Sequence, residues 1–308
     1  MTSDAYSYQF SGHETFPLRQ LWLHKIHKYV RAKICDPKSI SFSSEEAMIE
    51  LGVGKNMLTS MKFWANATQF LDDQNHPTPL ANCIFGSFLN NPLDEFAENP
   101  STSWFVHWNL CKSPSQLTVF WYVFNLLNVN VITRSDLNSR FEEYVKNLGR
   151  KVSSQTLQRD VDVLLRSYVP MLSARKQQSF SEDLVEPFLS DLNIITVDSK
   201  DVLAITRSDR PTLNNSVFAY SLMDFWLSHS ANTASLDFTR IAYDDGSPGK
   251  VFKLDEESII KHLETLQEIT SGALLWTEQS GIRTLIRRDL ALKNPEEFMM
   301  RMVNQSYS

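Results

Sequence analysis

The sequence predicts a mainly α-helical fold with small β-hairpins (α+β), arranged as tandem helix-turn-helix or winged-helix-like units. Three observations support this fold class. Apolar residues recur at helical spacing through the first half of the chain. Short helical segments in this half are joined by tight turns that contain glycine. After Ser216, helical segments are followed by segments typical of β-hairpins. The expected units span residues 1–130, 131–212 and 213–308.

The first unit begins with an amphipathic helix over residues 18–32, where apolar side chains follow helical spacing. Ser43 or Ser44 can cap a second helix, whose first turn carries two glutamates that favour the positive end of the helix dipole. This helix ends at Gly52, and a third helix is expected over residues 55–67. Two short helices joined by such a turn are typical of a helix-turn-helix.

The third helix is the first candidate DNA-contacting element. Its outward-facing side chains carry hydrogen-bond donors that can meet phosphates and base edges in a major groove. The candidate DNA contacts are Lys55, Asn56, Ser60 and Lys62. The alternative is an internal helical hairpin that binds no ligand.

An aromatic segment over residues 81–130 is expected to form a packing block rather than a base-stacking platform. Beyond it, Thr133 or Ser135 starts a helix that ends at Gly149. Ser153 or Ser154 then caps a helix with one apolar stripe that ends before Pro170.

This second helical pair is locally basic. Residues 134–176 hold nine basic and five acidic residues, a net charge of +4 in a chain whose net charge is −6. Such an asymmetry is expected of a nucleic-acid-binding face, although a solvated helix surface would look the same. The candidate DNA contacts at the start of the second helix are Arg150, Lys151, Ser154, Gln155 and Arg159.

The last unit is expected to follow a polar linker over residues 207–215. It should contain a helix over residues 217–229 and a hairpin formed by RIAYDDGSPGKVFKL. Asp255 should cap another helix, and ALLWTEQSGIRTLIRR should form a second hairpin. In the first hairpin, the ammonium groups of Lys250 and Lys253 would be available to DNA phosphates.

Several classes of protein are excluded by composition. Glycine is scarce, at 9 of 308 residues, and the string LGVGKN lacks both the first glycine and the Ser/Thr of a phosphate-binding loop. Three cysteines without CxxC spacing argue against a disulfide scaffold.

The first residues show neither a basic nor an apolar leader segment, and no apolar run is long enough to span a membrane. We therefore expect a cytoplasmic globular protein with no membrane association.

The segment FSGHETFPLR contains the candidate catalytic residues His13, Glu14 and Arg19. An imidazole beside a carboxylate can move protons or hold a divalent ion at a phosphodiester, and the arginine can neutralise developing charge. The alternative is a structural turn in which His13 and Glu14 satisfy backbone groups at the start of the first helix.

Five motifs occur in the order seen in a known bacterial family. They are FSGHETFPLRQLWL, LGVGKNM with the following Trp64, PTPL, VSSQTLQRDVDVLLRSYVP and GSPGKVFKLDE. In these motifs the chain resembles a family of proteins of unknown function that are encoded beside DNA phosphorothioation and phage-defence genes. The resemblance spans residues 10–290.

The resemblance implies a DNA-binding protein with DNA-nicking activity. It would act with a cysteine desulfurase, an ATP-pyrophosphatase-type sulfur transferase and an ATPase, which together replace a non-bridging phosphate oxygen with sulfur. A divalent cation, Mg²⁺ or Mn²⁺, would be a possible cofactor. Two alternatives stay open: a non-catalytic subunit that recognises DNA and recruits the sulfur transferase, and a transcriptional regulator.

Overall fold

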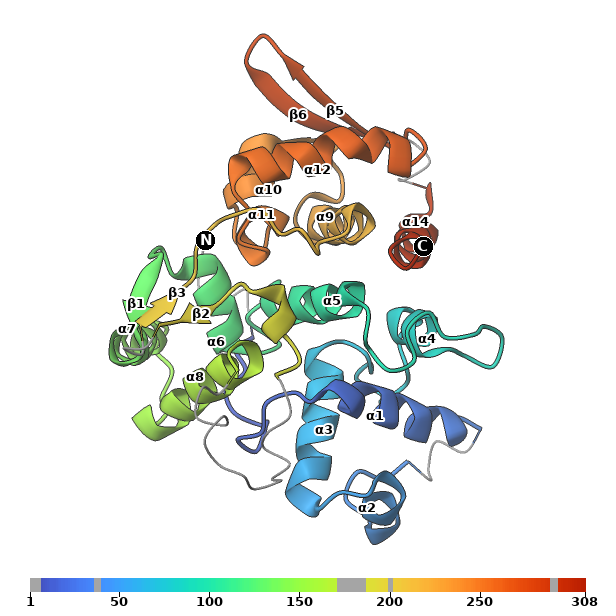
Figure 1. Cartoon of the computed structure of the whole chain (residues 1–308), viewed down its shortest axis with the longest axis vertical. Coiled ribbons are helices and arrows are strands. Elements are labelled where there is room, and N and C mark those ends of the chain that lie inside the picture. Colours follow the sequence, from blue (N-terminus) through green and yellow to red (C-terminus); the bar gives the residue numbers. More distant parts are fainter. Residues whose placement is uncertain (1–6, 36–39, 171–186, 199–201, 289–292) are drawn as a thin grey trace.

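The computed structural model describes residues 7–35, 40–170, 187–198, 202–288 and 293–308 (Figure 1). Helices dominate, and the strands form two small antiparallel sheets of three strands each. The predicted fold class, mainly α with small β elements, is therefore confirmed. None of the helices in these ranges is long and apolar enough to cross a lipid bilayer.

The N-terminal unit is entirely helical. Its helices are α1 (Gln20–Ala32), α2 (Glu45–Leu51), α3 (Lys55–Ala67), α4 (Pro79–Phe85) and α5 (Pro100–Cys111). Ser44 caps α2 by accepting a hydrogen bond from the Ala47 amide at 3.2 Å, and Gly52 ends it with a left-handed φ of 67°. Both α2 and α3 pack on α1, as the predicted pair of helices requires.

Residues 118–204, called the middle unit below, follow in the order helix, strand, two helices and two strands, and they begin before the boundary expected at residue 130. Its elements are α6 (Thr118–Trp121), η3 (Tyr122–Leu126), β1 (Val131–Thr133), α7 (Arg134–Asn147), α8 (Ser154–Tyr168), η6 (Ser190–Leu192), β2 (Thr196–Val197) and β3 (Val202–Ala204). The sheet has the order β1-β3-β2. Thr133 and Ser153 cap α7 and α8, as predicted from the sequence. This is the element order of a winged helix.

The C-terminal unit has a similar order, with one more α-helix between its first strand and its last two strands. Its elements are α9 (Asn215–Ser230), β4 (Ser235–Asp237), α10 (Phe238–Tyr243), α11 (Pro248–Val251), α12 (Glu256–Ile269), β5 (Leu274–Gln279) and β6 (Ile282–Arg287). The sheet order β4-β6-β5 corresponds to β1-β3-β2 in the middle unit. The predicted hairpin of β5 and β6 and the predicted cap at Asp255 are both confirmed.

The predicted first hairpin of this unit is wrong. The segment forms α10 and α11 instead, because Ser247 caps a helix that has Pro248 at its first position. A β-carbon on Gly249 would lie 2.6 Å from the backbone of Ala242, so the two helices approach more closely than any other residue would permit. The sequence DDGSPG therefore marks a helix-to-helix turn rather than a strand-to-strand turn.

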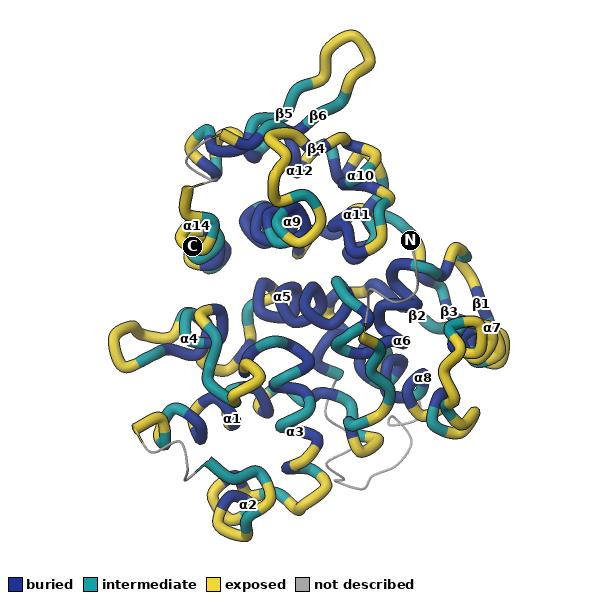
Figure 2. The backbone as a smooth tube through the Cα atoms, turned by 180° about the vertical axis from the view of Figure 1, so that it is seen from behind, coloured by how far each residue is buried: buried dark blue, intermediate teal, exposed yellow. Residues whose placement is uncertain are grey.

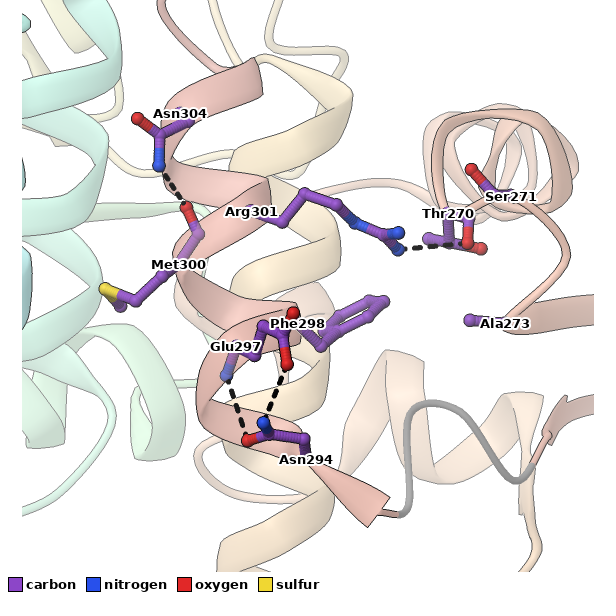
Figure 3. Close-up of a pocket in the computed structure, with 9 residues that line it drawn as sticks. All are labelled: Thr270, Ser271, Ala273, Asn294, Glu297, Phe298, Met300, Arg301 and Asn304. Carbon is purple, nitrogen blue, oxygen red and sulfur yellow. Dashed lines mark hydrogen bonds between the residues drawn. The ribbon is translucent and has the colours of Figure 1, made fainter.

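The last helix, α14 (Pro295–Gln305), packs against α9 and α4 and so joins the two ends of the chain. Ser101 in α5 donates a hydrogen bond to the Ser306 carbonyl at 2.8 Å. Between α14 and the end of α12 lies a cavity of about 520 Å³, where Arg301 donates to the Thr270 carbonyl at 3.1 Å (Figure 3).

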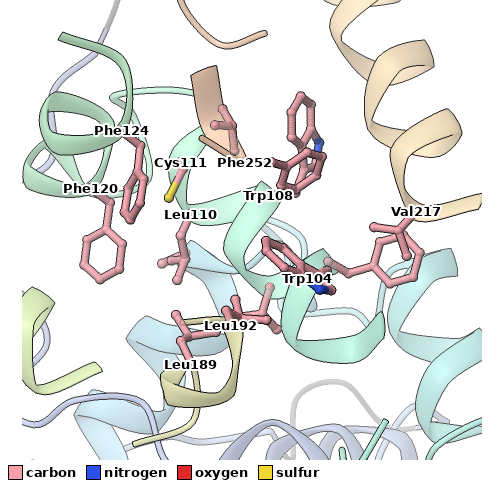
Figure 4. Packing of buried hydrophobic residues seen from close by; sticks show 14 of the residues in the cluster. Trp104, Trp108, Leu110, Cys111, Phe120, Phe124, Leu189, Leu192, Val217 and Phe252 are labelled. Carbon is pink, nitrogen blue, oxygen red and sulfur yellow. The ribbon is translucent and has the colours of Figure 1, made fainter. Parts of the chain in front are cut away.

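One continuous apolar core runs through all three units. Helix α5 lies at its centre and is buried from Ser101 to Cys111 (Figure 2). Trp104 and Trp108 of α5 pack against Phe252, and α5 also packs on α9 and η6 (Figure 4). The aromatic packing block expected over residues 81–130 is thus confirmed, whereas the division at residues 130 and 212 stays a prediction.

Candidate nucleic-acid interface

The segment that precedes α1 makes an unusual turn. Ser11, Gly12, Glu14 and Thr15 all have positive φ values, of 58°, 96°, 49° and 64°. Such values are rare outside glycine and persist only where the surroundings enforce them. A β-carbon at Gly12 would lie 2.7 Å from the ring of Phe63 in α3. The turn is therefore pressed tightly against α3.

His13 is the inward-pointing residue of this turn and is 2% exposed. Its Nε2 lies 2.9 Å from Oδ1 of Asp160 in α8, whose side chain is fully buried. Its Nδ1 accepts a hydrogen bond from the Thr15 amide at 3.1 Å, so Nε2 carries the proton that is donated to Asp160. The Asp160 carboxylate also accepts from the Ser11 amide at 3.2 Å.

The turn is held by α3 on one side and by α8 on the other. From α3, the Ser60 hydroxyl donates to the His13 carbonyl at 2.9 Å, and Trp64 Nε1 donates to the Phe16 carbonyl at 3.0 Å. From α8, the guanidinium of Arg166 donates to another carbonyl of the turn. These contacts fix α3 and α8 relative to each other through the residues around His13.

The three candidate catalytic residues are placed differently. His13 is enclosed, which agrees with the structural alternative, whereas Glu14 is exposed. The guanidinium of Arg19 lies 5.9 Å from the Phe16 ring and 5.4 Å from the Trp22 ring. The geometry makes His13 a positioning residue, and a catalytic role for Glu14 or Arg19 stays a prediction.

Two of the four predicted contacts on α3 are exposed at the surface. Lys55 and Asn56 are exposed in its first turn. Lys62 is half-buried, with its ammonium 5.2 Å from the centre of the Phe42 ring. The expectation that Ser60 faces outward is wrong, because this side chain is fully buried and bonded to the His13 turn.

All the predicted contacts on and before α8 are exposed. They are Arg150, Lys151, Ser154, Gln155 and Arg159. The guanidinium of Arg150 stacks over the Tyr8 ring at 5.5 Å, and the Ser154 hydroxyl donates to a carboxylate oxygen of Glu142. The first turns of α3 and α8 lie on the side of the molecule that faces away from the C-terminal unit (Figure 1). Arg175 and Lys176, which contribute to the basic character of the segment, lie outside the described residues.

Comparison with known proteins identifies the family to which the chain belongs. The family model for a protein of unknown function (DUF4007) matches residues 10–307. The chain belongs to the DUF4007 family. It is also similar to two solved structures, titled "SspB crystal structure" and "Magnesium ion-bound SspB crystal structure". Each has a TM-score of 0.81 and 25% sequence identity, covering 97% of this chain and 90% of that chain.

These matches confirm the resemblance carried by the five ordered motifs, which is to an SspB-like protein. No curated protein matches this member of the DUF4007 family.

Lys250 and Lys253 are not part of the surface formed by α3 and α8. Lys253 is only 8% exposed, and both lysines line a separate cavity between the middle and C-terminal units. Burial, together with the nearby charges of Arg207 and Lys250, lowers the pKa of Lys253 to about 8. The expected use of Lys253 as a surface phosphate contact therefore does not agree with its position.

Two residues of these sites are not singled out by the sequence pattern. Asp160 is one acid within a basic segment, although it lies on the apolar stripe beside Leu157 and Leu164. A lone carboxylate on such a stripe indicates a buried partner. Arg207 falls in the expected linker, but it lines the cavity of Lys253.

Within the described ranges, no three His, Cys, Asp or Glu side chains converge in a way that could hold a metal ion. The structure therefore shows no divalent-cation site formed by the described residues around Glu14.

Proposed function

We propose that this DUF4007 protein binds DNA across the first turns of α3 and α8. The observation that carries this proposal is the turn around His13, which fixes the two helices rigidly beside each other. Both helices begin with exposed basic or amide side chains, which suit phosphate and base-edge contacts. A fixed spacing between two such helices favours binding to a rigid duplex because less ordering is needed.

We further propose that the protein works in DNA phosphorothioation and nicks one DNA strand. The family membership and the likeness to SspB support the pathway, and the sequence resemblance supports the nicking. The partners would be a cysteine desulfurase, an ATP-pyrophosphatase-type sulfur transferase and an ATPase. Magnesium is bound in one SspB structure, which supports Mg²⁺ or Mn²⁺ as the cofactor to try first.

A second candidate function is DNA recognition without catalysis, with recruitment of the sulfur-transfer enzymes. The burial of His13 favours this candidate, because an imidazole that is 2% exposed and bonded to Asp160 cannot reach a phosphodiester. Glu14, exposed on the same turn, is then the residue that distinguishes the two functions.

The test is incubation of supercoiled plasmid with purified protein, with and without Mg²⁺ or Mn²⁺. Nicking predicts conversion of the plasmid to the open-circular form, and recognition alone predicts a mobility shift without conversion.

The variant Glu14→Gln keeps the side-chain shape and removes the charge. We expect it to lose nicking while its melting temperature and DNA affinity stay unchanged, because exposed substitutions change stability by less than about 0.5 kcal/mol. Full nicking by this variant would remove Glu14 from the mechanism.

A further inference from the structure

The cavity that contains Lys253 has the composition of an anion site. It lies between the η3–β1 connection of the middle unit and the segment around α11, and its volume is about 210 Å³. Three cationic side chains line it: Arg207, Lys250 and Lys253. None of the described residues that line it is acidic. It opens to solvent past Asn128 and Asn130, which are exposed.

Lys253 is the buried cation of this cavity. Its φ of 51° is left-handed, a strained value for lysine, and two backbone hydrogen bonds keep the residue there. Its amide donates to the Lys250 carbonyl at 3.1 Å, and its carbonyl accepts from the Ser208 amide at 3.0 Å. None of the hydrogen bonds and ion pairs of the described residues involves its ammonium group, which keeps some contact with solvent.

The other two cations are held in place by neighbouring groups. The guanidinium of Arg207 donates to the Ala242 and Leu254 carbonyls at 3.2 Å and stacks over the Tyr243 ring at 5.0 Å. Lys250 pairs with Asp245 at 2.5 Å. Asp245 thus neutralises Lys250, and the charge of Glu256 favours the cationic form of Arg207, but neither carboxylate pairs with Lys253.

An ammonium on a largely buried side chain without a protein partner is unfavourable because it has lost much of its hydration. An anion bound in the cavity would replace the lost hydration and offset the repulsion among the three cations. The cavity is smaller than the roughly 300–1,000 Å³ of pockets that enclose whole small molecules, so it fits an anionic group rather than a nucleoside. Multiple cationic donors around one small cavity suit the several oxygens of phosphate.

We propose that the cavity formed by Arg207, Lys250 and Lys253 binds a phosphate group carrying two negative charges. The group can be free inorganic phosphate or the terminal phosphate of a DNA strand. This site is separate from the surface of α3 and α8, and it stands whether or not that surface binds duplex DNA.

The test is a titration of the full-length protein with sodium phosphate, followed by calorimetry and by melting temperature. Sodium chloride at equal ionic strength is the reference. We expect saturable binding and a melting temperature that rises with phosphate but not with chloride. Lys253→Met should weaken phosphate binding about 10-fold or more, the usual value of a hydrogen bond to a charged group. Lys261→Met, which removes an exposed lysine of α12, is the matched control and should bind phosphate normally.

Lys253→Met should also change the melting temperature in a way that a loss of folding would not produce. Without phosphate, Lys253→Met should melt at the same or a higher temperature than wild type, because an unpartnered buried charge has been removed. With phosphate, its melting temperature should no longer rise. Equal effects of phosphate and chloride on wild type, or phosphate affinity within twofold of wild type in Lys253→Met, would overturn the proposal.

Two oligonucleotides distinguish the sources of the phosphate. A short single strand with a 5′-phosphate is compared with the same strand ending in a 5′-hydroxyl. A Lys253-dependent preference for the phosphorylated strand assigns the site to DNA ends. Equal binding of both strands, together with saturable binding of inorganic phosphate, assigns it to the free anion.

Discussion

The middle and C-terminal units have the same sheet order, and in both the helices lie between the first strand and the last two strands, but their surfaces differ. Helix α8 of the middle unit corresponds to helix α12 of the C-terminal unit. The exposed side chains at the start of α8 are basic or amide-bearing, whereas α12 exposes the acidic side chains of Glu256, Glu257, Glu264 and Glu268. The negative charge of this surface repels the phosphates of DNA.

The comparison shows that the topology of these units does not decide whether they bind DNA. The inner faces of the two helices differ as well. The buried face of α8 carries Asp160, which holds the turn around His13, whereas α12 buries His262 against Asn215 and Phe218. The middle unit is therefore coupled to the N-terminal unit at the place where its outer face is basic.

Removing the carboxylate that couples the units should have the largest effect. Asp160→Ala leaves the His13 turn without its acceptor and should reduce the free energy of unfolding by about 3–5 kcal/mol. The matched control is Asp162→Ala on the same helix, where the carboxylate is 41% exposed and pairs with Arg134. The Asp162→Ala substitution should reduce the free energy of unfolding by no more than about 1 kcal/mol. Urea unfolding of both variants measures the difference, and equal losses would show that the buried pair does not couple the units.

Acid should destabilise the C-terminal unit through His262. Burial lowers the pKa of this imidazole to about 4 from an ordinary value near 6.5. The unfolded chain therefore binds more protons between these values, so stability falls as pH drops from about 6.5 to 4, by up to about 1.4 kcal/mol per unit. His262→Gln should make this dependence less steep, leaving the part due to the buried His27 and His107, whereas His76→Gln, which changes a histidine nearer the surface, should not. Urea midpoints across this pH range provide the measurement.

The α3 surface is expected to contribute less than α8, because fewer cations lie there. Lys55→Glu with Lys62→Glu should weaken DNA binding and reduce the slope of log affinity against log salt by about one unit for each phosphate that the protein no longer neutralises. Fluorescence anisotropy over a salt series measures this slope. A folded double variant with unchanged affinity and slope would exclude α3 from the interface.

Elements set by local chemistry were predicted well from the sequence. Ser44, Ser153 and Asp255 cap their helices as expected, because a cap depends only on residues within one turn. The exposed position of Arg159 also followed from helical periodicity.

Elements set by distant contacts were not predicted. Ser60 turns inward because its partner is a carbonyl 47 residues away, and His13 meets an acid 147 residues away. The helices α10 and α11 form where a hairpin was expected, because Gly249 packs directly on the backbone of Ala242. Periodicity and turn propensity carry no information about such pairings.

The most direct test of the account is the salt dependence of DNA binding in two double variants of equal charge. One is Lys151→Ala with Arg159→Ala in the middle unit, and the other is Lys261→Ala with Arg283→Ala in the C-terminal unit. We predict that the middle-unit pair lowers the slope of log affinity against log salt by about two units for every DNA sequence, and that the C-terminal pair leaves it unchanged. Equal slopes in the two variants, or a larger loss in the C-terminal pair, would contradict the assignment of DNA binding to α8.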